Sequence, residues 1–234
     1  MRFQTELVPA RLVKRYKRFL ADCELEGGRI ITAHCANPGS MLGLAGPGTR
    51  VWLEPNDDPK KKLKFGWRLV DFGNDHFACV DTSLANKVVK EALLNGLVPG
   101  LTNRESVKAE VKYGQSSRID FLVNFGGDQN TYVEVKSVTL SRSRRLAEFP
   151  DSVTKRGAKH LAELEEMRRQ GHRALMLYLV QRTDCTKVTL AKDIDPNYTA
   201  AFIQARDAGV DVLALQADIT PEGIEVGKPL DFVL

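Results

Sequence analysis

The chain has 234 residues, with 34 basic and 30 acidic side chains, a formal net charge of +4 and 43% hydrophobic residues. This composition is typical of a globular protein and excludes a disordered chain, a collagen-like repeat and a coiled coil. No apolar run approaches the ~18 residues that a membrane-spanning helix needs, and residues 1–6 lack the apolar stretch of a signal peptide. Because the four cysteines form no CxxC pair, we expect a cytoplasmic protein with reduced thiols and no membrane partner.

The positive charge is concentrated in the first three quarters of the chain. Residues 1–82 carry 13 basic and 10 acidic side chains, residues 83–180 carry 16 and 11, and residues 181–234 carry 5 and 9. Clustered cations favour a polyanionic partner, because each neutralised phosphate releases condensed counterions. For any single run, a solvated surface is the alternative. The runs are Arg11, Lys14, Arg15, Lys17 and Arg18; Lys60, Lys61, Lys62 and Lys64; and Arg142, Arg144 and Arg145.

The first third of the chain predicts short strands joined by turns. A mixed run at residues 13–25 and a strand at residues 30–35 flank a turn that contains two glycines. The turn at residues 37–40 leaves two interpretations open: a backbone nest for a phosphate, or a plain turn in which Ser40 caps a short helix at residues 41–45. Further strands are expected at residues 50–54, 67–72 and 76–81. Five or so short strands in roughly 80 residues predict a small OB-like β-barrel over residues 1–82.

From residue 83 the pattern changes to helix, three strands, helix, strand, helix, strand. Such an order predicts an α/β (α+β) domain over residues 83–234, with a mixed sheet flanked by helices. The expected helices are residues 83–95, 152–170 and 195–209. The expected strands are residues 109–113, 118–123, 132–138, 174–180 and 211–219, with a further short strand at 188–191.

Two neighbouring strands of this second part each carry one acid among apolar residues. Glu134 and Lys136 are two residues apart, so their side chains project from the same face of a strand, and a hairpin brings Asp120 beside Glu134. A buried carboxylate pair is costly without a partner, which Mg²⁺ or Mn²⁺ would supply. The chemistry implied is phosphodiester hydrolysis, with Lys136 orienting the attacking water. The alternative is a Glu–Lys pair on a solvated sheet face.

Asp120 followed by Glu134-Val135-Lys136 resembles the PD-(D/E)XK nuclease motif, and the order of elements is similar to that of the nuclease core. The resemblance implies catalytic roles for Asp120, Glu134 and Lys136, with a metal held by Asp120 and Glu134. That core often carries a further acid on its first helix. Glu91 is the candidate metal ligand, because the helical period places it on the apolar stripe, facing inward. An ion pair with Lys87 is the alternative for Glu91, and Glu110 is a competing acid.

Longer segments resemble the SfsA family, the sugar fermentation stimulation protein A family. The resemblance implies an OB-like domain joined to a nuclease-like domain, DNA binding without sequence specificity, and a suggested regulatory link to maltose metabolism. Pro38 departs from the family pattern, which more often has Thr there, so a ligand-binding role for that turn is in doubt. The matching segments are residues 12–20, 34–41, 85–92, 106–114 and 149–161, together with Trp52 and the two acid-bearing strands.

Two further groups are candidates for phosphate contacts. Arg156 and His160 lie four residues apart on the helix after the Glu-x-Lys strand, and so share a helix face. Residues 141–145, with three arginines and two serines, predict a mobile phosphate-contacting loop. The alternatives are a solvated helix face for the first group and a disordered surface loop for the second. The expected DNA contacts, mainly to the phosphate backbone, are Arg15, Lys17, Arg18, Lys61, Lys62, Arg142, Arg144, Arg156 and His160.

The charge pattern and the acid-bearing strands favour a DNA-binding protein with a divalent-metal pocket, and the family resemblance implies binding without sequence specificity and a regulatory role in sugar (maltose) metabolism. The alternative is a Mg²⁺- or Mn²⁺-dependent DNA nuclease that acts through Asp120, Glu134 and Lys136. A third interpretation is a protein-interaction module that uses the acidic C-terminal segment, but it leaves the cationic runs unexplained. The natural substrate, the strand preference and the formation of a homodimer stay open.

Overall fold

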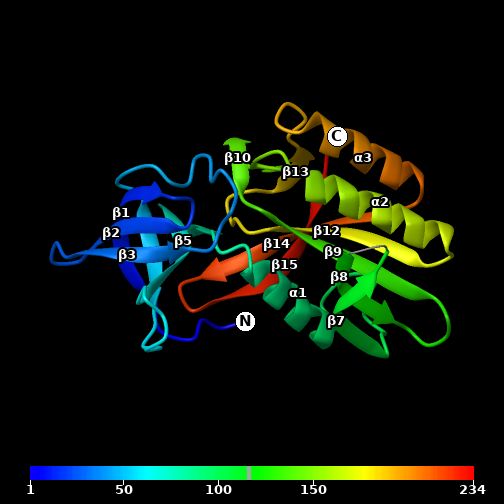
Figure 1. The fold of residues 1–234 in the computed structure, drawn as a ribbon, viewed down its shortest axis with the longest axis horizontal. Coiled ribbons are helices and arrows are strands. Elements are labelled where there is room, and N and C mark those ends of the chain that lie inside the picture. The colour runs from blue at the N-terminus through cyan, green and yellow to red at the C-terminus, as the bar shows by residue number, and fades with distance from the viewer. Residues whose placement is uncertain (115–116) are drawn as a thin grey trace.

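The computed structural model describes residues 1–114 and 117–234. Over these residues the chain forms two sheets, which lie next to each other along the long axis of the molecule (Figure 1). The first sheet, coloured blue to cyan, is built from the N-terminal part of the chain and has six strands. They are β1 (Val8–Tyr16), β2 (Leu20–Leu25), β3 (Ile30–Cys35), β4 (Arg50–Pro55), β5 (Phe65–Gly73) and β6 (His76–Cys79).

A parallel pairing of β3 with β5 closes the first five strands into a barrel. The pairing joins His34 to Gly66 and Cys35 to Trp67, and β6 then extends the sheet beyond β5. Trp67, Leu12 and Leu53 are fully buried inside it. The predicted OB-like barrel is confirmed, whereas its end at residue 82 stays a prediction.

The second sheet has nine strands in the described part of the chain, in the order β10-β11-β13-β15-β14-β12-β9-β8-β7. It is mixed, because β12 runs parallel to both β9 and β14 while β7, β8 and β9 form an antiparallel meander. The strands are β7 (Ser106–Tyr113), β8 (Ser117–Asn124), β9 (Asn130–Val138), β10 (Leu140–Ser143), β11 (Leu146–Phe149), β12 (Arg173–Val180), β13 (Lys187–Leu190), β14 (Asp211–Thr220) and β15 (Gly223–Phe232).

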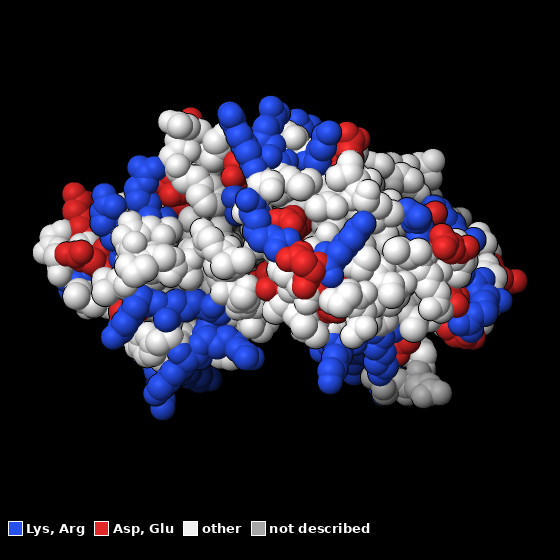
Figure 2. Space-filling view, turned by 90° about the horizontal axis from the view of Figure 1, so that it is seen from above, with Lys and Arg blue, Asp and Glu red and all other residues white. Residues whose placement is uncertain are grey.

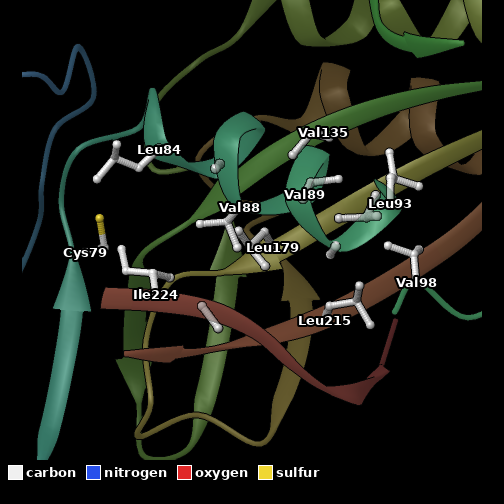
Figure 3. Close-up of a cluster of buried hydrophobic side chains, with 14 of the residues drawn as sticks. Cys79, Leu84, Val88, Val89, Leu93, Val98, Val135, Leu179, Leu215 and Ile224 are labelled. Carbon is white, nitrogen blue, oxygen red and sulfur yellow. The ribbon is translucent and has the colours of Figure 1, made fainter. Parts of the chain in front are cut away.

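Helices cover both faces of this sheet, as the sequence predicts. On one face α1 (Leu84–Asn95) packs in an apolar cluster with Leu177 and Leu179 of β12. Figure 3 shows Leu179 in this cluster beside Val88 and Val89 of α1. On the other face α2 (Lys155–Arg169) and α3 (Pro196–Asp207) pack on Met176 and Tyr178. The alternation along β12 follows from the two-residue period of a strand, and every residue of that strand after Arg173 is buried.

Several expected elements differ from the structure. The short helix at residues 41–45 is wrong: the segment is a turn, in which the Leu44 N–H donates to the Met41 carbonyl. The strands β10, β11 and β15 are additional, and β15 contains Gly227 and Pro229, which are uncommon inside strands. No helix of the described residues is long and apolar enough to cross a membrane.

Candidate functional site

Asp120 lies where β8 separates from β9. The ladder between the two strands runs from Asn124↔Asn130 to Phe121↔Val133 and stops there. Beyond that point, the Val135 N–H donates to Asp120 Oδ2 at 2.7 Å, so the carboxylate replaces a backbone acceptor. The other oxygen, Oδ1, accepts from Asn86 Nδ2 of α1 at 2.7 Å. Both oxygens therefore accept a hydrogen bond, one from the backbone of β9 and the other from a side chain of α1.

Glu134 is buried on the α2 face of β9, beside Lys136. Its Oε1 atom accepts from Lys136 Nζ at 2.7 Å and also bonds to the Nδ1 atom of His160. Its Oε2 atom is buried and has no hydrogen-bond partner among the described residues. Only 2% of Glu134 is exposed, so this carboxylate combines an ion pair with an unsatisfied oxygen in a nearly dry position.

The N-terminus of α2 brings His160 to this carboxylate. Thr154 caps the helix by accepting from the Gly157 N–H at 3.1 Å, and its own N–H donates to Asp195 Oδ2 at 2.7 Å. One helical turn apart, Arg156 Nε donates to His160 Nε2 at 3.2 Å. Both ring nitrogens are therefore engaged within the protein, so the structure places His160 against Glu134 rather than on the surface, where a DNA contact was expected.

The two carboxylates have opposite shifts in pKa. Burial, followed by the nearby charge of Glu134, raises the pKa of Asp120 to about 6. Burial also raises the pKa of Glu134, but hydrogen bonds and charge from His160 and Lys136 outweigh it and leave that pKa below its ordinary value. Glu134 is therefore ionised at neutral pH, while Asp120 holds its charge less firmly.

A cavity of about 880 Å³ opens over these residues, between the barrel and the second sheet. The predicted catalytic side chains Asp120, Glu134 and Lys136 all line it. The wall also contains Arg15, Arg18, Arg156 and His160, together with the turn at residues 37–40 and the segment at residues 148–154. The cavity is thus lined by residues of the barrel and by residues of the second sheet and its helices.

The turn at residues 37–40 docks on Asp151 and closes one side of the cavity. Ser40 Oγ donates to the Asp151 carbonyl at 2.7 Å, and the Met41 N–H donates to Asp151 Oδ2 at 3.2 Å. A Cβ atom on Gly39 would lie 2.3 Å from the same Oδ2 atom, so this close approach requires glycine. The helix that Ser40 was expected to cap does not form, and the Ser40 hydroxyl and the Met41 N–H instead bind Asp151, while a phosphate-binding role of the turn stays a prediction.

Arg15 supports this turn, although the sequence predicts a DNA contact. Its Nη2 atom donates to the carbonyls of Asn37 and Gly39 at 2.9 and 3.0 Å, and Nε donates to the Arg18 carbonyl at 3.0 Å. The guanidinium is thus occupied by backbone acceptors. Lys17 and Arg18 are instead exposed, in the tight turn between β1 and β2.

The arginine-rich segment at residues 141–145 belongs to a hairpin of β10 and β11, which corrects the expected mobile loop. Arg142 forms ion pairs with Glu148 at 2.6 Å and with Asp193 at 2.5 Å, so two carboxylates compensate its charge. Arg144 is exposed near the tip of the hairpin. Both arginines expected to contact DNA here are exposed, but carboxylates compensate the charge of Arg142, whereas Arg144 forms no ion pair among the described residues.

Lys61 and Lys62 lie apart from the main cavity. They are exposed in the loop between β4 and β5 and line a second, smaller cavity in the barrel domain, together with His34 and Phe65. The residues expected to contact DNA therefore do not form one compact surface. The expected contacts divide into a group around the main cavity and a group on the barrel.

Glu91 does not face the site, contrary to the expectation from helical periodicity. Its side chain is 51% exposed and pairs with the amino group of Met1 at 3.2 Å. The buried stripe of α1 consists of Leu84, Ala85, Val88, Val89, Ala92 and Leu93, and it leaves position 91 outside. Among the described residues, no group of three or more His, Cys, Asp and Glu side chains is arranged to hold a metal ion.

Asn86 is the residue of α1 that reaches the site, and the sequence interpretation missed it. Only the first turn of α1 lies beside the cavity, which is lined by Ala85 and Asn86. The available signal was a single polar amide beside the buried stripe at the start of the helix. The amide of Asn86 is uncharged, so its hydrogen bond orients the Asp120 carboxylate without compensating the negative charge as a cation would.

Two family models match the chain. Residues 13–80 match the SfsA N-terminal OB domain, and residues 83–223 match the sugar fermentation stimulation protein RE domain. A sugar fermentation stimulation protein homolog of Roseobacter denitrificans is 70% identical over 97% of this chain and 97% of its own length. The corresponding protein of Ruegeria pomeroyi is 66% identical over 98% of this chain and 100% of its own length.

Among solved structures, that of Pyrococcus furiosus SfsA in complex with Ca²⁺ is similar to this chain with a TM-score of 0.87 and 25% sequence identity. The match covers 100% of this chain and 98% of that one. The barrel and the mixed sheet thus recur together in that protein. From the two matched domains and the high identity to its relatives, the chain belongs to the sugar fermentation stimulation protein (SfsA) family.

Proposed function

We propose that the chain binds DNA through the phosphate backbone, without sequence specificity, and holds a divalent cation at Asp120 and Glu134. The observation that carries this proposal is the convergence of two carboxylates and the Lys136 ammonium in one cavity with arginines in its wall. Binding to a phosphate backbone needs such cations, and a metal ion would compensate the buried Glu134 and the half-buried Asp120. A regulatory role in sugar metabolism, including maltose metabolism, would act through this DNA binding.

The two carboxylates fit a hard divalent cation. Glu134 Oε2 is buried without a hydrogen-bond partner among the described residues, and the pKa of Asp120 is raised by burial and by Glu134. A cation bound by both carboxylates would give Oε2 a partner and favour the ionised form of Asp120. Mg²⁺ and Mn²⁺ take such oxygen ligands and keep water ligands, so two carboxylates are enough. The Ca²⁺ complex of the Pyrococcus furiosus relative supports the same choice of ligand class.

The exposed cations support binding to phosphates rather than to bases. Arg18 belongs to the barrel side of the cavity wall, Lys17 is exposed beside it in the same turn, and Arg144 lies on the hairpin of the second sheet. Figure 2, which shows the molecule from above the view of Figure 1, has Lys and Arg side chains in separate groups, with carboxylates between those near the middle. Phosphate contacts fix the position of a protein on DNA and carry no sequence information.

Binding is tested by fluorescence anisotropy, with labelled duplexes of unrelated sequence, at several salt concentrations. We expect similar affinities for all sequences and a steep decrease of affinity as salt increases. The measurement is made with EDTA present, so that bound duplex is not cleaved. An affinity that changes little with salt, or that differs by orders of magnitude between sequences, would contradict the proposal.

A second function, metal-dependent phosphodiester hydrolysis, is favoured by the position of Lys136. Its ammonium lies 2.7 Å from Glu134 Oε1 and lines the cavity, where it would stabilise charge that develops on a phosphate. Asp120 and Glu134 would hold the cation, which supplies Lewis acidity and an acidified water when bound. Asn86 and the Val135 N–H would keep Asp120 in its orientation.

Hydrolysis is tested by nicking of supercoiled plasmid with Mg²⁺ or Mn²⁺, with wild type and Lys136→Ala purified identically. Cleavage by wild type alone would establish this second function. Equal cleavage by both proteins would point to a contaminant or another site, and no cleavage would leave DNA binding as the function of the chain. In all three cases, the anisotropy measurement reports on binding independently.

A further inference from the structure

We propose that Phe19 and His34 form a base-stacking platform on the barrel, and that this platform gives the chain a preference for single-stranded nucleic acid. The inference rests on the proposed function and names the substrate class of the same binding surface. It starts from an aromatic pair that neither the barrel core nor the main cavity uses.

Phe19 presents its ring to solvent in a fixed position. It is 43% exposed, and its ring stacks on His34 with centroids 6.4 Å apart and an angle of 27° between the planes. The Phe19 carbonyl accepts from the Cys35 N–H at 2.9 Å, which anchors the residue beside the end of β3. His34 is also exposed. The pair therefore offers a flat aromatic surface whose backbone is already ordered.

Exposed cations stand next to this platform. Lys17 and Arg18 immediately precede Phe19, and both have left-handed backbone conformations, with φ of 47° and 65°. The turn is therefore tight, and it carries the two cations and the ring on a short segment. Arg18 also lines the main cavity, so a nucleotide on the platform would lie close to the entrance of the candidate site.

The second cavity lies on the other side of the platform. It has a volume of about 360 Å³, and His34, Lys61, Lys62 and Phe65 belong to its wall. Asn56 also lines it, and its Oδ1 atom is buried without a hydrogen-bond partner among the described residues. The amino group of a nucleobase is a donor of the kind that this oxygen lacks. The platform is thus joined to the second cavity through His34 and, through the neighbouring Arg18, to the wall of the main cavity.

Charge along this path also favours a nucleic acid. The loop between β4 and β5 carries Lys60, Lys61, Lys62 and Lys64 against Asp57 and Asp58, an excess of two cations. Alternation of cations with an exposed ring is typical of surfaces that bind the backbone electrostatically and stack the bases. Within a duplex the base faces are covered by neighbouring pairs, so the platform reaches bases only where the strand is unpaired.

The inference is tested by the affinity of four proteins for a labelled oligothymidine and for a duplex, in EDTA. The proteins are wild type, Phe19→Ala, Phe19→Trp and the control Ile30→Ala. Ile30 is 62% exposed at the start of β3, so its loss removes exposed apolar surface from the same strand pair without touching the platform. Because Phe19 and Ile30 are both exposed, we expect every variant to fold, and thermal unfolding checks this.

We expect wild type to prefer the single strand, and Phe19→Ala to lose about tenfold or more in affinity for it. Duplex affinity should change by no more than about twofold, because its salt-dependent phosphate contacts remain. Phe19→Trp should keep wild-type affinity, and Ile30→Ala should match wild type for both ligands.

Three results would overturn the inference. Equal single-strand binding by wild type and Phe19→Ala, with duplex binding intact, refutes the platform and leaves the proposed function standing. Binding of neither nucleic acid by wild type refutes both. An equal loss with Ile30→Ala would also refute the platform, because the effect would then follow from exposed apolar area rather than from the aromatic ring.

Discussion

The two faces of β9 show how one strand serves two purposes. Val133 and Val135 point toward α1 and are buried in an apolar cluster. Glu134 and Lys136, the residues between and beside them, point toward α2 and form the candidate site with His160. Both faces are largely covered by helices, but only the apolar face is expected to stabilise the fold. The apolar face stabilises the sheet, whereas the polar face holds a carboxylate oxygen without a partner among the described residues.

This difference predicts the largest effect on the α1 face. Leu179 is fully buried there, on β12, so Leu179→Ala should lower the free energy of unfolding by about 2–5 kcal/mol. Denaturant unfolding measures the change. DNA affinity, measured where the variant is fully folded, should equal that of wild type. A loss of affinity in the folded variant would show that the two faces are coupled and would weaken the comparison.

The polar face should respond in the opposite direction. The folded pKa of Asp120, about 6, lies above its ordinary value of 3.8, so the folded state binds the proton more tightly than the unfolded state. Ionised Asp120 therefore destabilises the fold as the pH rises from about 4 to 6. Asp120→Asn removes this charge, and the amide of Asn86 can turn to accept a hydrogen bond from the new side chain.

We expect Asp120→Asn to be more stable than wild type by about 1–3 kcal/mol at neutral pH, without divalent cations. The difference should vanish below about pH 4, where Asp120 is protonated in both states. Thermal or denaturant unfolding across this pH range provides the measurement. A variant that is less stable than wild type at neutral pH would contradict the raised pKa assigned to Asp120.

Arg15 and Arg18 sharpen the contrast between structural and exposed cations within the barrel. Arg15→Ala leaves the carbonyls of Asn37 and Gly39 without their donor, so it should lower stability by about 1–2 kcal/mol. Arg18→Ala should leave the unfolding midpoint unchanged and weaken duplex binding several-fold. The reverse pattern would show that the guanidinium of Arg15, rather than that of Arg18, contacts the phosphates.

The smallest effect on DNA binding is expected at Arg144, on the hairpin of β10 and β11. Arg144→Ala should weaken duplex binding slightly and reduce the salt slope by about 1, as expected for the loss of one phosphate contact. Arg144→Lys keeps the charge and serves as the matched control, with the wild-type slope. If the slope is unchanged in Arg144→Ala, the hairpin lies outside the DNA-binding surface.

The barrel, the mixed sheet and the two faces of β9 could be predicted, because strand alternation and helix periodicity report burial directly. The adjacency of Asp120 and Glu134 also followed from the hairpin between them. Glu91 could not be placed correctly, since a shift of the buried stripe to Val89 and Leu93 moves position 91 outward. The hydrogen bonds of Arg15 to the turn at residues 37–40 and the ion pairs of Arg142 could not be predicted either. Their partners are 22 or more residues away in the sequence or lie on a different element.

The central claim is that Asp120 and Glu134 bind a divalent cation, and calorimetric titration of Ca²⁺ into the metal-free protein tests it most directly. Glu134→Gln keeps the shape of the side chain and removes its charge. The account predicts binding to wild type that weakens as the pH falls through about 6, where Asp120 takes up a proton, and no binding to Glu134→Gln. Equal binding to both proteins would place the cation elsewhere and contradict the account.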